Sequence, residues 1–230
     1  MTNVIVHGFQ RSTFVNMVRL TLTHKEVPFE FKDLEPVMGT PTHRALHPFN
    51  RVPILEHDGF RVYETIAILN YVDEAFAGPK LRPDAPCERA RMMQWIGAVG
   101  SYYYYWMVYH VGHERNVFPE LGIASDEKVV AKALPNIANA FDVLERELGE
   151  RRGFLIGDQP TLADFAMLPM MTSFSQHKDG QDMLAARPRI REWRQRVEAL
   201  PSVGRFRASL PPREPIWHAR AWAESHRPKY

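Results

Sequence analysis

Two hydroxyl side chains stand where the sequence suits chemistry with a sulfur anion. Ser12 and Thr13 follow the apolar run "NVIVHGF" and precede a segment whose apolar residues recur with helical spacing. A thiol with a pKa of about 8.5 is mostly protonated at neutral pH, and lowering that pKa by about two units takes about 2.7 kcal/mol. A hydroxyl that donates to an anion contributes about 1.5–3 kcal/mol, and a helix N-terminus adds up to about 1 kcal/mol. Ser12 is therefore either a plain helix cap or a hydrogen-bond donor to a thiolate.

A second pair, Glu64 and Thr65, suits the charged end of an α-amino acid. Thr65 opens the predicted helix "TIAILNYVDEAF", where free backbone N–H groups and the positive end of the helix dipole attract a carboxylate. Glu64 beside it offers a negative charge to an ammonium group. The alternative is that Thr65 only caps the helix while Glu64 lies in solvent, and the two residues taken alone favour this simpler interpretation.

The composition describes an ordinary globular protein that brings little sulfur chemistry of its own. Of 230 residues, 45% are hydrophobic and 24% are charged, and the net charge of +2 is no signature of nucleic-acid binding. No apolar run approaches the ~18 residues of a membrane span, and we expect no signal peptide. The single cysteine, Cys87, excludes an internal disulfide and follows the loop-like "RPDAP". We therefore expect a reducing compartment, most simply the cytoplasm, and a sulfur that arrives with a ligand.

One clear break in composition, "AGPKLRPDAPCE" at residues 77–88, predicts a linker. Before it, "NVIVHGF", the segment from Ser12 and "PFEFKDL" predict strand, helix and strand. The stretch "VPILEHDGFRVYE" predicts a hairpin, because Asp-Gly separates two strand-like runs, and a helix follows from Thr65. We expect a small α/β domain of thioredoxin-like pattern over residues 1–79, in the order β-α-β, an irregular segment, then β-β-α.

After the break the strand signals disappear and helical patterns remain. One long helix is predicted at 88–114, and a second in "DEKVVAKALPNIANAFDVLERELGE", where Pro135 predicts a kink or a break. The segment "TLADFAMLPMMTSF" starts with Thr161 and Asp164 at the spacing of a capping box, and "PRIREWRQRVEALPSV" predicts a further amphipathic helix. We expect an all-helical domain over residues 87–230.

Four segments in this order make the chain resemble the glutathione S-transferase family. "GFQRST" is similar to the nucleophile-activating turn of its serine-type classes (phi/theta-like or bacterial), and "HPFNRVPIL" to its "NP-x-G-x-VP" stretch. "YETIAI" is similar to its Glu-Ser/Thr-x-Ala-Ile helix start, and "LIGDQPTLADF" to its "G-x-x-x-T-x-AD" motif. The resemblance covers most of the chain. It implies an N-terminal thioredoxin-like domain that binds glutathione, followed by an all-helical domain that carries the electrophile pocket.

The resemblance assigns the two pairs of residues to two parts of one ligand, glutathione. Glu64 and Thr65 would hold its γ-glutamyl group, and Ser12 would donate to its sulfur without being a nucleophile itself. Thr13 is the alternative donor to the sulfur.

The resemblance also implies a main-chain contact to the middle of the ligand. The Val52–Pro53 bond is cis in the resembled fold and turns the Val52 backbone outward, so that the cysteinyl part of glutathione can add there as a short strand. Arg51, just before, can reach a carboxylate.

Three departures from the family pattern bear on glutathione affinity. Gln10 stands where the serine-type turn often has proline. The basic pair that contacts the glycyl carboxylate has no clear match in "VMGTPTHRAL", where Thr40, His43 and Arg44 are the candidates. Asn50 replaces the glycine of "NP-x-G", which is tolerable where φ is positive.

The stretch "SYYYYWMVYH", residues 101–110, lies on the helix that lines the electrophile pocket of the resembled fold. Four consecutive tyrosines lie about 100° apart on an α-helix, so they cannot share one role. Aromatic walls suit a flat, apolar substrate, and the alternative is packing between helices or across a dimer contact. His110 and His113 lack a carboxylate or cysteine partner, so we expect no metal site. The pocket residues we expect are Phe9, Phe14, Tyr102, Tyr103 and Trp106.

We therefore predict a glutathione transferase whose bound thiolate attacks small apolar or aromatic electrophiles. Glutathione is the expected co-substrate, and we expect a cytoplasmic homodimer without metal, nucleic-acid or membrane partners. The same scaffold suits a glutathione-dependent lyase, isomerase or dehalogenase, or a non-catalytic ligand-binding protein. A thiol-disulfide reductase is disfavoured, because Ser12 cannot form a mixed disulfide. We expect the tail with Trp217 and Trp222 to pack over the helical domain or to roof the pocket.

Overall fold

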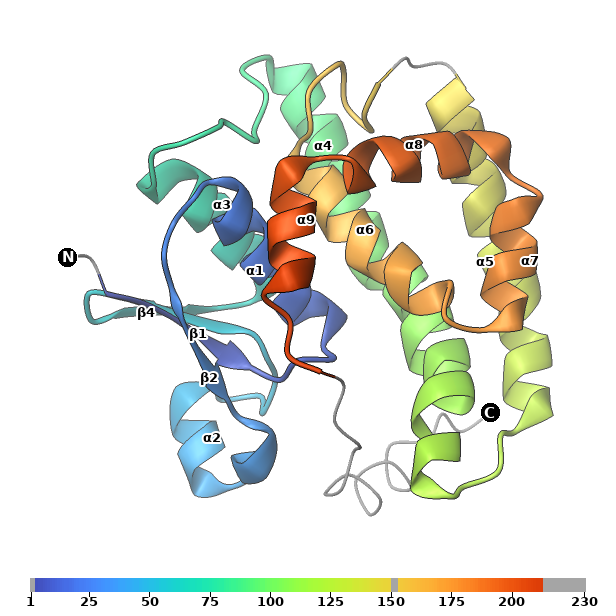
Figure 1. Ribbon diagram of the computed structural model, residues 1–230, viewed down its shortest axis with the longest axis horizontal. Helices are drawn as coiled ribbons and strands as arrows, with labels where there is room; N and C mark the ends of the chain where they lie inside the picture. Colours follow the sequence, from blue (N-terminus) through green and yellow to red (C-terminus); the bar gives the residue numbers. More distant parts are fainter. Residues whose placement is uncertain (1–2, 150–152, 213–230) are drawn as a thin grey trace. The chain divides into compact units, whose positions relative to one another are not determined.

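The computed structural model describes residues 3–149 and 153–212 (Figure 1). These residues form two compact units, the first containing residues 3–89 with 198–211 and the second residues 90–149, 153–197 and 212. The first unit is α/β and the second is helical, so the predicted fold class is confirmed. Compactness alone does not define domains, and the bounds 1–79 and 87–230 stay a prediction. Trp217 and Trp222 lie outside the described residues.

A four-stranded sheet in the order β2-β1-β3-β4 forms the centre of the first unit. β1 is parallel to β2 and antiparallel to β3, and it is buried along its whole length, as its unbroken apolar run predicts. The predicted hairpin joins β3 to β4, where Asp58 and Gly59 have φ angles of 48° and 88°. Positive φ at both positions is what a two-residue hairpin turn requires. The strands are β1 (Val4–Gly8), β2 (Glu30–Asp33), β3 (Ile54–His57) and β4 (Phe60–Tyr63).

Helices cover both faces of this sheet. Figure 1 shows α1 (Thr13–His24) and α3 (Thr65–Ala75) on one face and α2 (Pro41–Leu46) on the other. α1 also contacts α9 (Pro201–Ala208), which explains why so much of its surface is buried. The short 3₁₀ helix η1 (Glu35–Val37) and α2 occupy the segment that we expected to be irregular. A helix as short as α2 shows no periodicity, although Thr40 at its N-cap and Pro41 after it are start signals.

The second unit is organised around α6 (Leu162–Phe174), which lies among the other helices of this unit in Figure 1. Its residues are mostly apolar and almost all of them are buried. We predicted a kink or a break at Pro135, and the break does not occur, because α5 (Glu127–Gly149) runs through Pro135 as one helix. The predicted helix before Pro201 is α8 (Pro188–Glu198). Two short helices were not predicted, the 3₁₀ helix η3 (Pro119–Leu121) and α7 (Lys178–Ala185).

The long helix expected at 88–114 is present but has two geometries. α4 (Pro86–Ala98) is followed directly by the π-helix η2 (Val99–Val117). At the end of η2, the Phe118 N–H donates to the carbonyl oxygen of His113 at 2.9 Å, five residues back. The expected spacing of about 100° per residue was therefore wrong for the tyrosine stretch. π-helical segments are rare and are often found at functional sites.

The capping box predicted at the start of α6 is confirmed. Asp164 is completely buried and accepts four hydrogen bonds. Its Oδ2 accepts from the N–H and the hydroxyl of Thr161 at 2.8 and 2.9 Å. Its Oδ1 accepts from the Leu155 N–H at 2.9 Å and from the Trp193 Nε1–H at 2.8 Å. One carboxylate therefore joins α6, the preceding loop and α8.

Four histidines make the stability of the fold depend on pH. Burial is the largest influence on each and lowers its pKa below the usual value of about 6.5. As pH falls, such histidines bind protons more readily in the unfolded chain, which favours unfolding. Their stabilisation is therefore complete above about pH 6.5 and is lost as pH falls toward the folded-state pKa values. The four are His24, His47, His110 and His177.

We expect a lower melting temperature at about pH 5.5 than at about pH 7.5. His177→Asn provides a matched variant, because the Nδ1 of His177 accepts from the Gly180 N–H at 3.3 Å and an asparagine oxygen can replace it. The variant should lose part of the pH dependence. A melting temperature that rises on acidification would contradict the role of these histidines.

Candidate active site

The sheet register brings the three predicted glutathione-binding segments to the same end of the sheet. His7 on β1 pairs with Ile54 on β3, which in turn pairs with Tyr63 on β4. The next residues toward this end of the three strands are Gly8, Pro53 and Glu64. The Ser12 turn after β1, the Val52–Pro53 segment before β3 and the start of α3 after β4 therefore lie at the same end of three neighbouring strands.

Ser12 caps α1 and keeps its own proton free. Its Oγ accepts from the Val15 N–H at 3.3 Å, while its N–H donates to the Phe9 carbonyl at 3.2 Å and closes a turn. Within the described residues, no acceptor takes the hydroxyl proton of Ser12. A Cβ at Gly8 would lie 2.4 Å from Val15 Cγ2, so glycine is needed where β1 meets α1. The Ser12 hydroxyl can cap the helix and donate to an anion at the same time.

Thr13, the alternative donor, is enclosed by the protein. Its side chain is 5% exposed, and its Oγ1 is buried without a hydrogen-bond partner among the described residues. Ser12 is half-buried and remains in reach of a ligand. Accessibility therefore favours Ser12 over Thr13 as the donor to a sulfur.

Glu64 and Thr65 form the start of α3 and leave the Glu64 carboxylate and the first backbone N–H groups of the helix available to a ligand. The Glu64 carboxylate is exposed and has no partner among the described residues. The first helical bond runs from the Ile68 N–H to the Glu64 carbonyl at 3.0 Å, and no side chain caps the helix, so the N–H groups of residues 65–67 lack helical partners. Glu64 also has φ 71° and ψ 112°. Such backbone strain costs about 1–3 kcal/mol in a non-glycine residue and is concentrated at functional sites.

The Val52–Pro53 peptide bond is cis, as the resemblance implies. The main chain of Val52 makes no hydrogen bond to any described residue, and the Arg51 side chain is exposed. Asn50 has φ 52°, the positive value at which asparagine can replace glycine.

His43 was expected among the candidates for binding a carboxylate, and the structure corrects this. It is completely buried, and its Nδ1 accepts from the Gly39 N–H at 3.2 Å. Its Nε2 therefore carries the proton and donates to the Arg51 carbonyl at 3.0 Å. His43 supports the backbone of Arg51 and is not available to a ligand.

Two other candidates for the carboxylate are only partly free. Thr40 caps α2 through its Oγ1, which accepts from the His43 N–H at 3.4 Å, and its hydroxyl donates to the Val37 carbonyl at 2.7 Å. Arg44 is exposed and donates to the Gly39 carbonyl at 3.3 Å. Arg51 is the exposed guanidinium next to the Val52 backbone.

His47 is a residue of this region that sequence reasoning missed. It is buried, its Nδ1 accepts from the Phe49 N–H at 3.2 Å, and its ring lies 4.6 Å from that of Tyr63. Burial lowers the pKa of His47, while the charge of Glu64 acts in the opposite direction. The signal was its place before Pro48, where the resembled motif has asparagine.

The residues expected in the electrophile pocket belong to both units and differ in how far they are buried. Phe9 and Phe14 are half-buried in the first unit. In the second unit Tyr102 is 61% exposed, whereas Tyr103 is 3% exposed and donates its hydroxyl to the Ala140 carbonyl at 2.7 Å. Burial also raises the pKa of Tyr103, which keeps its hydroxyl protonated. Tyr103 thus follows the alternative, packing between helices. Trp106 is half-buried beside the rings of Tyr105 and His110.

His110 is a hydrogen-bond donor in the π-helix. Its Nδ1–H donates to the Tyr105 carbonyl at 2.7 Å, and burial lowers its pKa.

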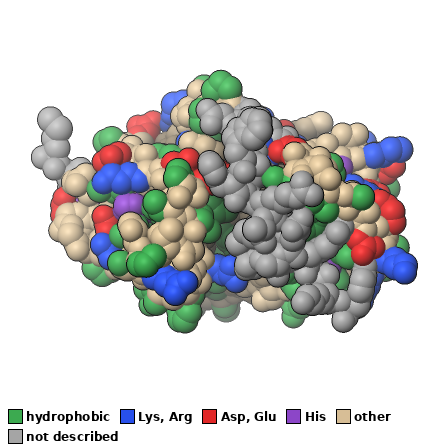
Figure 2. All heavy atoms as spheres, turned by 90° about the horizontal axis from the view of Figure 1, so that it is seen from below, with side chains coloured by type: hydrophobic (Ala, Val, Ile, Leu, Met, Phe, Trp, Pro, Cys, Tyr) green, Lys and Arg blue, Asp and Glu red, His purple; other side chains and the backbone are tan. Residues whose placement is uncertain are grey.

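Over residues 3–149 and 153–212, no group of three or more His, Cys, Asp or Glu side chains is arranged to hold a metal ion. In the same residues, no helix is both long and apolar enough to cross a membrane. On the face in Figure 2, basic and acidic side chains are interspersed.

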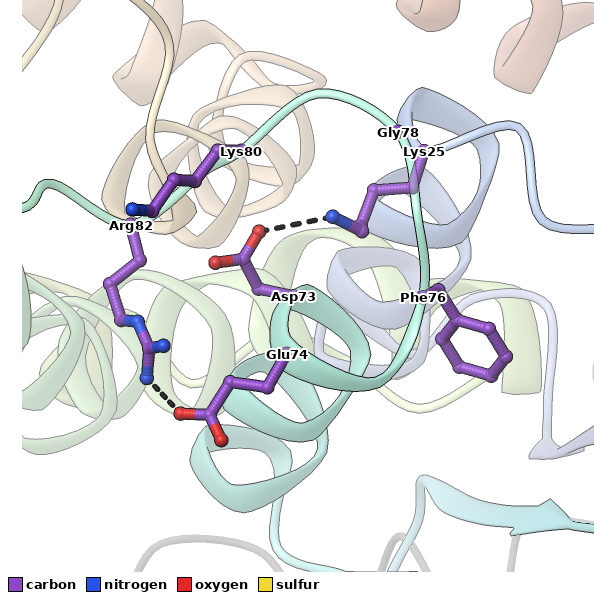
Figure 3. Close-up of a pocket in the computed structure, with 7 residues that line it drawn as sticks. All are labelled: Lys25, Asp73, Glu74, Phe76, Gly78, Lys80 and Arg82. Carbon is purple, nitrogen blue, oxygen red and sulfur yellow. Dashed lines mark hydrogen bonds and ion pairs between the residues drawn. The ribbon is translucent and has the colours of Figure 1, made fainter.

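A cavity of about 450 Å³ in the first unit contains none of the predicted site residues. Its walls are held together by charges, since Lys25 Nζ lies 3.2 Å from Asp73 Oδ1 (Figure 3). The same ammonium donates to the Pro79 carbonyl at 3.1 Å, and Asp73 accepts from the Leu81 N–H at 2.8 Å. This buried ion pair therefore anchors the start of the linker. The lining residues are Lys25, Asp73, Glu74, Phe76, Gly78, Lys80 and Arg82.

Comparisons with known proteins agree with this geometry. The family model of the glutathione S-transferase N-terminal domain matches residues 6–80, and that of the C-terminal domain matches residues 103–201. Glutathione S-transferase 3 of Zea mays is 31% identical over 218 residues, which cover 92% of this chain and 96% of that protein. The apo structure of glutathione S-transferase III has a TM-score of 0.83 at 26% identity, covering 93% and 99% of the two chains. Glutathione transferase F2 from Populus trichocarpa has a TM-score of 0.81 at 27% identity, covering 89% and 97%.

Proposed function

The chain belongs to the glutathione S-transferase family and is a glutathione transferase, and on this premise we propose that Ser12 holds the sulfur of bound glutathione as a thiolate. The observation that carries the proposal is the hydroxyl of Ser12, which accepts from the Val15 N–H and keeps its own proton for a second partner. A hydrogen bond to an anion is worth about 1.5–3 kcal/mol, and the N-terminus of α1 adds to it.

The rest of the first unit binds and orients the tripeptide. The free N–H groups at the start of α3 take the α-carboxylate of the γ-glutamyl group, and Glu64 takes its ammonium. The unpaired main chain of Val52 bonds to the cysteinyl backbone, and Arg51 pairs with the glycyl carboxylate. His43 supports this last contact, because its bond to the Arg51 carbonyl fixes the backbone of the loop. Thr40 and Thr13 are left out, because the Thr40 hydroxyl is already bonded and that of Thr13 is buried.

The reaction is attack of the thiolate on a small apolar or aromatic electrophile. The thiol proton leaves for solvent when glutathione binds, a carbon–sulfur bond forms, and the leaving group departs with its electron pair. We propose the half-buried rings of Phe9 and Phe14, on either side of Ser12 in the sequence, as contacts of the electrophile, because aromatic side chains suit flat apolar substrates. Conjugation of glutathione to a generic aromatic electrophile tests this function. Glutathione binding without any conjugation would point instead to a ligand-binding protein.

Glu64→Gln is expected to raise the KM for glutathione about 10- to 100-fold, because it removes the negative charge opposite the ammonium while keeping the shape of the side chain. The kcat should change much less, since Glu64 does not touch the sulfur. Steady-state kinetics with varied glutathione measure both. Glu30→Gln is the matched control, because Glu30 lies on β2, the edge strand farthest from β4, and pairs with Ile5 of β1 at the end of the sheet opposite Gly8. Equal KM values for Glu64→Gln and the parent would remove this assignment.

We also propose that the protein is a homodimer in the cytoplasm. Two apolar side chains of the first unit support a contact with a second copy, since Phe49 is 67% and Phe60 is 51% exposed. Light scattering of the purified protein would give the mass of a dimer, and the mass of a monomer at all concentrations would contradict this.

A further inference from the structure

Arg19 is a buried positive charge without a negative partner. Arg19 lies on α1 and is 3% exposed, and no carboxylate of the described residues lies within ion-pair distance of its guanidinium. Its guanidinium carbon lies 4.5 Å from the ring centre of Phe31 and 5.7 Å from that of Phe206. Its Nε is buried without a hydrogen-bond partner. Since buried charges are normally paired, this arrangement needs a reason.

The only side-chain acceptor that Arg19 reaches within the described residues is in the turn before α1. Its Nη1 donates to Gln10 Oε1 at 2.5 Å. Long side chains on a helix point back toward its N-terminus, so the guanidinium lies nearer the turn than its own Cα does. The Asn16 Nδ2–H donates to the carbonyl oxygen of the same Gln10 at 3.0 Å. α1 therefore holds both the side chain and the backbone of Gln10.

Gln10 lies inside the turn that presents Ser12. The bond from the Ser12 N–H to the Phe9 carbonyl closes this turn around Gln10 and Arg11. The hydroxyl proton of Ser12 can point at a sulfur only if the turn keeps its shape. Because catalytic groups tolerate little misplacement, a fixed Gln10 matters for the reaction as well as for the fold.

We infer that Arg19 is a positioning residue, which fixes the turn through Gln10 and thereby aims the hydroxyl of Ser12 at the sulfur of glutathione. This inference rests on the proposed role of Ser12. Arg19 would act on the reaction only through Gln10, since its buried guanidinium is not among the groups proposed to contact glutathione or the electrophile.

A double-mutant cycle tests the pathway from Arg19 through Gln10. The cycle uses Arg19→Met, Gln10→Met and the variant that carries both substitutions. Methionine keeps the side-chain length, while Arg19→Met removes the donor and Gln10→Met removes the acceptor. Each single variant should lower kcat about tenfold and raise the thiol pKa of bound glutathione, with little change in the KM for glutathione. The double variant should be no worse than either single one, because both break the same contact. Arg205→Met is the control, since Arg205 pairs with Glu26 on the surface of the same unit.

Two results would overturn the inference. One is an unchanged kcat and thiol pKa in both single variants, even with a lower melting temperature, which would leave Arg19 a purely structural role. The other is a double variant in which the two losses multiply. If Arg19→Met does not fold, the half-buried Gln10→Met decides alone. A parent enzyme that does not lower the thiol pKa of glutathione would overturn the role of Ser12 together with this inference, whereas a lowered pKa that persists in the variants would overturn only the role of Arg19.

Discussion

Ser12→Ala is expected to lower kcat/KM for conjugation about 10- to 100-fold while glutathione still binds. The hydroxyl supplies a hydrogen bond that is much stronger to a thiolate than to a thiol, whereas the contacts at Glu64 and Val52 do not depend on the charge of the sulfur. Steady-state kinetics give the loss in rate, and calorimetry gives the affinity for glutathione.

The same substitution also removes the cap of α1, which costs about 1 kcal/mol of stability. Ser12→Asp separates the two effects, because aspartate caps a helix well but places a negative charge beside the sulfur. It should keep the melting temperature and lose the activity. Thr13→Val tests the other hydroxyl and should keep kcat/KM. A loss in Thr13→Val equal to that in Ser12→Ala would transfer the role to Thr13.

Asp164→Ala should lower the free energy of unfolding by about 3–5 kcal/mol, the range for breaking a buried charged network. It leaves buried donors of Thr161, Leu155 and Trp193 without an acceptor. Natural proteins are stable by only about 5–15 kcal/mol, so a much larger fraction of the Asp164→Ala molecules should be unfolded or aggregated than of the parent.

Denaturant or thermal unfolding measures this effect. Asp182→Ala is the matched control, because Asp182 forms an exposed pair with Lys178 on α7, and such pairs contribute about 0–1 kcal/mol. Asp164→Asn should fall between the two, since an amide oxygen can accept from some of the four donors. A loss of less than about 1 kcal/mol in Asp164→Ala would contradict the importance of the capping box.

The parts of the fold that were predictable from sequence are those specified by local signals. Asp58 and Gly59 predicted the hairpin because few residues accept positive φ, and Thr161 with Asp164 predicted the start of α6. α2 was missed because its helix is too short for a hydrophobic period. The π-helical geometry of η2 was missed because apolar residues spaced four apart fit an α-helix equally well. Residues 198–211 group with the first unit through contacts between α9 and α1, which no local pattern reports.

The candidate site divides in the same way. Ser12, Val52–Pro53 and Glu64–Thr65 were found because each is a short motif at the start or end of an element. The buried hydroxyl of Tyr103, the two bonds of the His43 ring and the contact between Arg19 and Gln10 depend on tertiary packing. Side chains that support the site without touching the ligand are therefore found only from the three-dimensional structure, whereas those that touch the ligand can be proposed from motifs.

The central claim is that the Ser12 hydroxyl stabilises the thiolate of glutathione, and the thiol pKa of enzyme-bound glutathione tests it most directly. The absorbance of the thiolate, titrated against pH with the parent enzyme and with Ser12→Ala, gives this pKa. We predict a value about two units below the usual thiol pKa of about 8.5 in the parent, and a return of at least about one unit toward it in Ser12→Ala. The same thiol pKa in both proteins would contradict the claim.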